Sequence, residues 1–140
     1  EERDWLALPL SLRAPIYDDL GFDITAGGEG WLEVTLTITE RLLNADGVLH
    51  GGMWTLISDS AMGGAIRTLI DPTERTATSQ SDFRWLRPLH GDTLRSVGRV
   101  LRRGRSVWHC TVECFDAAGI LVGVGSGTFV VVGRDRPEPA

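Results

Sequence analysis

The sequence has little of several features that would point to particular classes of protein. It has only two cysteines and three histidines in 140 residues, and its formal net charge is −5. It contains no run of the ~18 apolar residues that a membrane-spanning helix needs, and no signal-peptide pattern at its start. The acidic balance argues against general binding to nucleic acids or anionic membranes, because such binding requires a basic surface. A local basic spot for a phosphorylated ligand is still compatible with it.

The two cysteines, Cys110 and Cys114, stand four residues apart in a strand-like stretch. Their Cα atoms would lie about 13 Å apart at ~3.3 Å per residue, whereas a disulfide needs Cα atoms within about 7 Å. A bridge within that strand is therefore excluded, and we expect two buried free thiols and a cytoplasmic protein. The sequence shows no HExxH or CxxC spacing, so no metal site is expected. GxGxxG and P-loop patterns are absent as well.

The composition is that of a soluble globular domain, with 42% hydrophobic and 24% charged residues. A chain of this length can bury a core without disulfides or metals. We expect one domain over residues 1–140, with an N-terminal extension at about 1–20 and a loose polar tail at 133–140. Pro9 and Pro15 limit the extension to short helices. The sequence begins with Glu1 rather than methionine, which leaves open whether other residues precede it.

Residue spacing predicts one strand, one long helix and then four more strands. Apolar and polar residues alternate over residues 31–40, as in a strand with one buried face. Residues 51–70 follow helical spacing and are apolar or small on almost every side, which predicts a buried helix that ends at Asp71-Pro72. The four further strands are predicted at residues 76–86, 93–102, 106–115 and 121–132.

Short links between these strands predict antiparallel hairpins. The expected fold is therefore α+β, with one antiparallel sheet wrapped around the central helix. A helix that is apolar on all sides needs cover on all sides, which one sheet cannot supply. We expect a second copy of the chain to supply the rest.

The most informative segment reads NADGVLHGGMWTLISDSAMGGA and spans residues 44–65. An Asn and a Gly precede His-Gly-Gly at the helix start, and an acidic residue follows nine positions after the His. This pattern resembles the signature of PaaI-like hotdog thioesterases, and the predicted strand order fits that family from about residue 20 to residue 133. The matching residues are Asn44, Gly47, His50, Gly51, Gly52 and Asp59.

The resemblance implies a hotdog fold that hydrolyses an acyl-CoA or aryl-CoA thioester to the free acid and CoA. It implies a homodimer, or a tetramer made of two dimers. No cofactor is expected, because water is the second substrate and CoA is part of the first. Two rival functions are a hydratase or dehydratase acting on acyl thioesters, and a non-catalytic acyl-CoA binding or sensor module. The acyl group and the pathway stay open.

The resemblance also implies catalytic roles for two residues. Asp59 would act as general base or as nucleophile, and the Gly51 N–H at the helix N-terminus would donate to the oxyanion. Gly51 and Gly52 let a ligand approach the backbone closely, although two glycines also suit an ordinary tight turn. An Asp inside a helix is costly to bury unless it is paired or functional. Hydroxyls such as those of Thr55 or Ser60 could also satisfy it.

The spacing of these two residues constrains the assembly. Gly51 and Asp59 are eight residues apart on one helix, or about 12 Å at ~1.5 Å per residue. Both cannot touch the same thioester from one chain. A two-fold dimer with antiparallel central helices would bring Asp59 to the Gly51 of the other subunit and create two identical composite sites.

Three further polar residues are catalytic candidates. Asn44 could bind the water or the thioester carbonyl, or could simply be a turn residue. In the resembling family the His mainly orients the turn and positions the thioester, and we expect the same of His50. Aligning the aromatic-x-x-Pro at residues 85–88 with the family's strand ending places Thr78 near the acid. An ordinary strand threonine is the alternative.

The remaining candidates concern substrate binding. Arg103 and Arg105 lie in a hairpin around Gly104, and forked guanidinium groups suit the phosphates of CoA, although a solvated turn is the default interpretation. The other predicted substrate-binding residues are Gly52, Met62, Gly63 and Trp85. The predicted walls of an acyl pocket are Trp54, Met62, Phe83 and Trp85. The bulky ones among them could equally be core residues.

Overall fold

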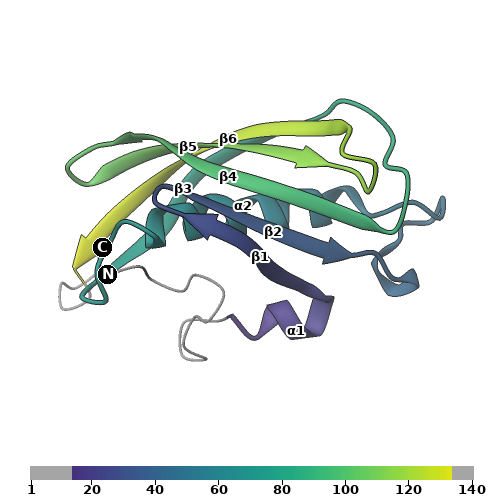
Figure 1. Ribbon diagram of the computed structural model, residues 1–140, viewed down its shortest axis with the longest axis horizontal. Helices are drawn as coiled ribbons and strands as arrows, with labels where there is room; N and C mark the ends of the chain where they lie inside the picture. The colour runs from purple at the N-terminus through teal and green to yellow at the C-terminus, as the bar shows by residue number, and fades with distance from the viewer. Residues whose placement is uncertain (1–13, 134–140) are drawn as a thin grey trace.

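The computed structural model describes residues 14–133; the predictions about residues 1–13 and 134–140 lie outside the described residues. Figure 1 shows a sheet packed on one long helix, with a short helix beside it. The elements are α1 (Ile16–Leu20), β1 (Phe22–Gly28), β2 (Trp31–Thr37), a 3-10 turn (Glu40–Leu42), α2 (Gly51–Arg67), β3 (Glu74–Trp85), β4 (Thr93–Arg103), β5 (Val107–Phe115) and β6 (Leu121–Gly133).

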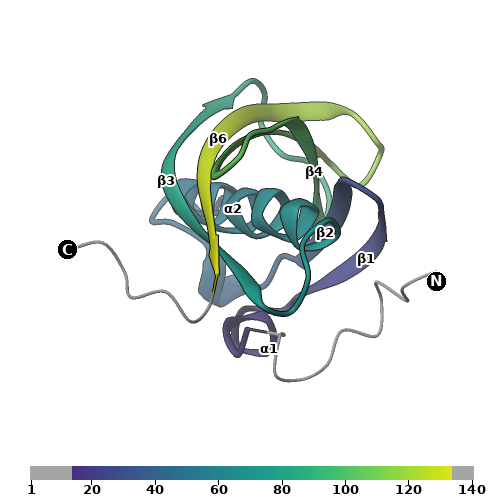
Figure 2. The same cartoon turned by 90° about the vertical axis from the view of Figure 1, so that its left-hand side faces the viewer.

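The six strands form one antiparallel sheet in the order β1-β2-β4-β5-β6-β3. Figure 2 looks into this sheet and shows it curved around α2, with β1 and β3, its two edges, on opposite sides of the helix. The predicted α+β architecture, a sheet wrapped around a central helix, is confirmed.

Glycines allow the helix to lie close to the sheet. A Cβ on Gly98 of β4 would come within 2.3 Å of the Ala61 carbonyl oxygen, and one on Gly64 of α2 would come within 2.1 Å of the Leu32 side chain. Ala61 and Leu32 are buried, as is Ile57 on the same helix. The core thus lies between α2 and the concave face of the sheet, and it fixes the helix that carries the predicted site.

Two expectations about the strands need correction. The link at residues 86–92 does not form a hairpin, because β3 pairs with β6 and not with β4. Three strand spacings of about 4.8 Å separate β3 from β4, and a link at residues 86–92 can span that ~14 Å. β1 (Phe22–Gly28) was not predicted, because it is a short edge strand that ends in two glycines.

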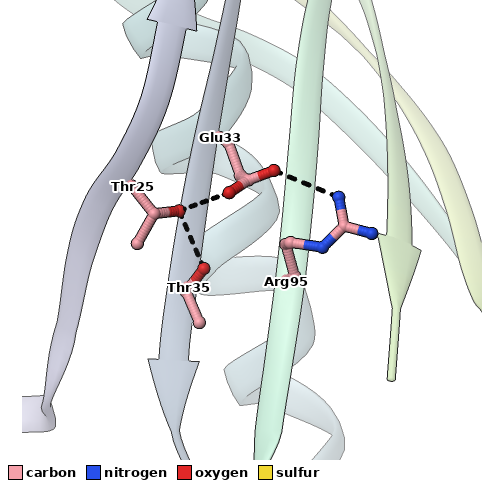
Figure 3. A network of polar contacts seen from close by, with 4 residues as sticks. All are labelled: Thr25, Glu33, Thr35 and Arg95. Atoms are coloured by element: carbon pink, nitrogen blue, oxygen red, sulfur yellow. Dashed lines mark hydrogen bonds and ion pairs between the residues drawn. The ribbon is translucent and has the colours of Figure 1, made fainter. Parts of the chain in front are cut away.

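A polar network fastens β1 to the rest of the sheet (Figure 3). Thr25 of β1 donates to Glu33 Oε1 at 2.6 Å, and the Arg95 guanidinium of β4 lies 3.1 Å from Glu33 Oε2. The Thr25 and Thr35 hydroxyls are 2.8 Å apart. Because the Thr25 proton is donated to Glu33, Thr35 is the donor of this second hydrogen bond. The ion pair is partly exposed, and it contributes at most about 1 kcal/mol.

Both cysteines are buried and free, as the sequence predicted. Burial raises the pKa of Cys110 to about 12 and also raises the pKa of Cys114. The Ser96 hydroxyl lies 3.0 Å from the Cys114 sulfur. Within residues 14–133, no helix is both long and apolar enough to cross a membrane.

Candidate active site

The first turn of α2 begins with a histidine cap. His50 is the N-cap residue, and its Nδ1 accepts a hydrogen bond from the Gly52 N–H at 3.0 Å. A Cβ on Gly52 would lie 3.2 Å from Nδ1, so the glycine leaves room for this cap. In the described chain, the Gly51 N–H has no hydrogen-bond partner. The Gly51 N–H is therefore available to donate to a ligand. His50 orients the turn that carries this N–H.

Asn44 organises the loop that precedes this turn. Its Oδ1 accepts hydrogen bonds from the backbone N–H groups of Asp46 at 2.9 Å and Val48 at 3.2 Å. Its own N–H donates to the Val48 carbonyl at 2.7 Å. Asn44 is therefore a turn residue, which is one of the two roles that the sequence left open. A contact between the Asn44 side-chain NH2 and a substrate stays a prediction.

Asn44 and Gly51 line the same open cavity, which has a volume of about 880 Å³. We call it the Gly51 groove. Trp54 and Trp85 form part of its apolar wall, and Trp85 is 51% exposed. Phe83 lies between the two, with ring centroids 6.1 Å from Trp54 and 4.9 Å from Trp85. The groove is thus an aromatic-walled hollow at the N-terminus of α2.

A second, smaller cavity lies further along α2 and holds the predicted acid. We call it the Asp59 cavity; its volume is about 200 Å³. Thr78 of β3 donates a hydrogen bond from Oγ1 to Asp59 Oδ1 at 2.6 Å. The two residues are therefore in direct contact, as the resemblance implied for their positions. The cavity is lined by Ala14, Tyr17, Ile24, Leu32, Asp59, Ser60, Gly63, Gly64, Arg67, Thr76, Thr78 and Phe129.

Asp59 is half-buried in the single chain, not enclosed. The sequence predicted that one sheet cannot cover this helix on all sides, and Figure 2 shows α2 running between the sheet edges β1 and β3. Asp59 and Gly63 are only half-buried, in agreement with that prediction. The two predicted catalytic groups, Gly51 and Asp59, lie in different cavities of the same chain. The two groups are thus separated within one chain.

The predicted substrate-binding residues fall into three groups. Gly63 lines the Asp59 cavity and Trp85 lines the Gly51 groove. Gly52 is exposed and serves the His50 cap. Met62 is only 1% exposed and lies against Gly127 in the core, which is the alternative that the sequence left open for it. Helical spacing could not separate a side chain facing the sheet from one facing a cavity.

Arg103, in the hairpin between β4 and β5, faces the same side of the sheet as Thr78. Arg103 pairs across the ladder with Trp108, Trp108 with Phe129, and Phe129 with Thr78. Three strand spacings thus separate Arg103 from Thr78, or about 14 Å. The Arg103 guanidinium lies 4.7 Å from the centre of the Trp108 ring. Arg105 is exposed and lines a different hollow together with Glu74.

Sequence reasoning missed several residues of the Asp59 cavity, among them the polar residues Arg67 and Thr76. Arg67 follows Asp59 by eight residues, slightly more than two helical turns, so the spacing alone placed both on one side of α2. Thr76 stands two residues before Thr78 on β3 and therefore faces the same side of the strand. Residues 14–133 contain no cluster of three or more side chains that could hold a metal ion.

Comparison with known proteins identifies the family. The sequence matches the Thioesterase superfamily over residues 46–122, and the chain belongs to that superfamily. The acyl-coenzyme A thioesterase PaaI of Escherichia coli K12 is 32% identical over 95 residues, which are 67% of this chain and 66% of that protein. These matches confirm the predicted PaaI-like resemblance and support thioester hydrolysis as the general activity.

Solved structures agree on the fold. The PaaI protein from the phenylacetic acid degradation operon of E. coli has a TM-score of 0.79 at 26% identity, and the match covers 89% of this chain and 88% of that one. A thioesterase from Haemophilus influenzae has a TM-score of 0.82 at 21% identity, with 89% and 87% of the two chains covered. The predicted hotdog fold is therefore confirmed.

Proposed function

We propose that this protein hydrolyses an acyl-CoA thioester to the free acid and CoA, as a homodimer with two composite sites. Asp59 of one subunit and the Gly51 N–H of the other serve the same thioester. The observation that carries the proposal is the separation of these two groups into different cavities of one chain. Neither cavity alone offers both a carboxylate and a free helix N-terminal donor.

The geometry of α2 supports the dimer. The half-buried face that carries Asp59 is partly open, and β3 forms an unpaired sheet edge with exposed residues from Ala77 to Asp82. Unpaired edges are usually covered or paired in native proteins. A second copy related by a two-fold axis, with the α2 helices antiparallel, covers this face and brings each Asp59 to the partner's groove. Two such dimers could further join into a tetramer.

The chemistry follows from the contacts at each half-site. Attack on the thioester carbonyl places negative charge on its oxygen, and the Gly51 N–H donates to that oxygen with the favourable helix dipole behind it. Asp59 either takes a proton from the attacking water or attacks the carbonyl itself. The C–S bond then breaks and CoA leaves as the thiolate, which takes up a proton. If Asp59 attacks directly, the product at this point is an acyl-Asp59 anhydride, and water hydrolyses it to the free acid and restores the carboxylate. Thr78 holds Oδ1 of the carboxylate, so Oδ2 is available for this work.

Three other residues complete the proposed site. His50 fixes the turn that presents the Gly51 N–H. The side-chain NH2 of Asn44 donates to the water or to the thioester carbonyl from within the Gly51 groove. Arg103 and Arg105 contact CoA phosphates from the hairpin. The ~14 Å between Arg103 and Thr78 is comparable to the length of the pantetheine arm that separates the thioester from those phosphates.

The first experiment measures CoA release from short, long-chain and aryl acyl-CoAs by trapping the free thiol. Asp59→Asn should lower kcat roughly 10²-fold or more, the usual scale for loss of a general base. Glu113→Gln is the matched control, because Glu113 is an exposed carboxylate on β5 that lines neither cavity and lies away from the β3 edge. Wild-type protein that binds acyl-CoA but releases no thiol from any of them would be a binding module and not an enzyme.

Subunit mixing tests the composite site. Asp59→Asn and Gly51→Pro each damage both sites of their own homodimer, while a mixed dimer keeps one intact site. Random assortment makes half of the dimers mixed, so about a quarter of the wild-type activity should return. If mixed dimers form and no activity returns, both groups act within one chain and the dimer mechanism is wrong.

A further inference from the structure

Arg67 is a half-buried cation that lines the Asp59 cavity. It occupies the last turn of α2, and within residues 14–133 it forms no ion pair or hydrogen bond through its side chain. Side chains on a helix tend to lean towards its N-terminus, and Arg67 lines the same cavity as Gly63 and Asp59. Gly63 has no side chain, which leaves space for it along this face.

Thr76 places a second polar group at the same cavity. Its Oγ1 is buried and has no hydrogen-bond partner in the part of the chain that the structure describes. Thr76 lines the cavity, as Arg67 does. Buried hydroxyls without a partner are uncommon because desolvation is not compensated. Among residues 14–133, these two donors at one cavity have no acceptor, which indicates a ligand that supplies one.

The remaining wall limits what that ligand can be. Ile24, Leu32 and Phe129 give the cavity an apolar side, and its volume is only about 200 Å³. Asp59 and Arg67 lie about 12 Å apart along the helix axis, and both line this cavity. The space fits a few methylene groups between a thioester at Asp59 and an acceptor at Arg67.

We propose that this pocket selects a short acyl group with a carboxylate at its far end, bound by the Arg67 guanidinium and the Thr76 hydroxyl. The proposal rests on the proposed function and names its substrate class. A guanidinium presents forked N–H groups that match a carboxylate, and the attraction is stronger in a partly desolvated site than in water. A cation in the last turn of α2 also interacts favourably with the helix dipole. That structural role would leave the Thr76 hydroxyl without an acceptor.

The test compares two acyl-CoAs that share a shape and differ in charge. Glutaryl-CoA ends in a carboxylate, and 5-methylhexanoyl-CoA ends in an isopropyl group of similar size. Wild type should hydrolyse glutaryl-CoA with the higher kcat/KM. Arg67→Met should lower kcat/KM for glutaryl-CoA about 10- to 100-fold, the range for a lost hydrogen bond to a charged group, and leave the neutral substrate within about two-fold.

Further variants separate this role from a structural one. Arg67→Lys keeps the charge at the helix end and should retain part of the glutaryl preference. Thr76→Val keeps the side-chain shape and should lower kcat/KM for glutaryl-CoA alone, about 10-fold, which also tests the pocket if Arg67→Met does not fold. Arg84→Met, on an exposed residue of β3, should change neither rate. Equal losses on both substrates, or no wild-type preference, would overturn the proposal.

Measuring the binding of acyl-CoAs to the Asp59→Asn variant separates the carboxylate-pocket proposal from the thioesterase proposal. If wild type hydrolyses neutral acyl-CoAs but calorimetry shows no Arg67-dependent preference of Asp59→Asn for glutaryl-CoA, the carboxylate pocket is wrong and the thioesterase stands. If Asp59→Asn prefers glutaryl-CoA, loses that preference with Arg67→Met, and wild type still releases no CoA, the pocket stands and the catalytic proposal is wrong.

Discussion

Replacing Gly51 with proline should remove the proposed oxyanion donor while leaving the helix intact. Gly51 is the first residue of α2, and proline is favoured at that position because the N–H there has no partner within the helix. The preceding residue, His50, has φ −55° and ψ 131°, which is the backbone region that a following proline requires. A Cβ at Gly51 would meet the nearest ring atom of Trp85 at 3.8 Å, an ordinary contact.

The expected loss is large for catalysis and small for stability. Removing one oxyanion donor typically costs about 10²–10³-fold in kcat, or roughly 2.7–4 kcal/mol of transition-state stabilisation. No hydrogen bond of the folded chain is lost, because the Gly51 N–H has no partner among the described residues. A compatible Gly-to-Pro change often stabilises by about 0.4–1 kcal/mol. The melting temperature should therefore stay level or rise slightly.

Gly51→Ala is the matched control, since it adds the Cβ and keeps the N–H. We expect its kcat to stay within a few-fold of wild type in the same CoA-release assay. Size-exclusion chromatography would check that all three proteins form the same fraction of dimer. Equal activity of the proline variant and wild type would show that this N–H is not the donor. An equal fall in both variants would show that bulk at Gly51, and not the hydrogen bond, decides the rate.

Three further predictions follow from single contacts. Thr78→Val should lower kcat about 10-fold, because Asp59 loses a hydrogen bond to a charged group; an unchanged kcat would make Thr78 an ordinary strand residue. Gly98→Ala should cost about 3 kcal/mol of unfolding free energy in a denaturant titration, because its Cβ would lie 2.3 Å from the Ala61 oxygen; unaltered stability would mean that α2 can shift. Burial raises the pKa of Cys110 from 9.0 to about 12, so the unfolded thiol ionises first and the unfolding free energy should fall as pH rises between those values. Cys110→Ala should reduce that fall, and an equally steep fall in the variant would assign it to other groups.

Local spacing determined much of this protein. Strand alternation and helical spacing follow from backbone geometry within a few residues, and they predicted α2 and five of the six strands. The eight residues between Gly51 and Asp59 also fixed, through the helical rise, that one chain cannot bring both to one thioester. The cysteine spacing excluded a disulfide within β5 by the same kind of argument.

The tertiary structure decided which side chains meet. The contact of Thr78 with Asp59 depends on β3 lying at the sheet edge beside β6, a pairing that no local rule predicts and that the short link to β4 argued against. Met62 and Gly63 are neighbours in sequence, yet one is in the core and the other lines a cavity. Arg67 and Thr76 line the same cavity as Asp59 although they come from α2 and β3. Each of these outcomes depends on how the sheet curves around the helix, which is set by long-range packing and not by the pattern along the chain.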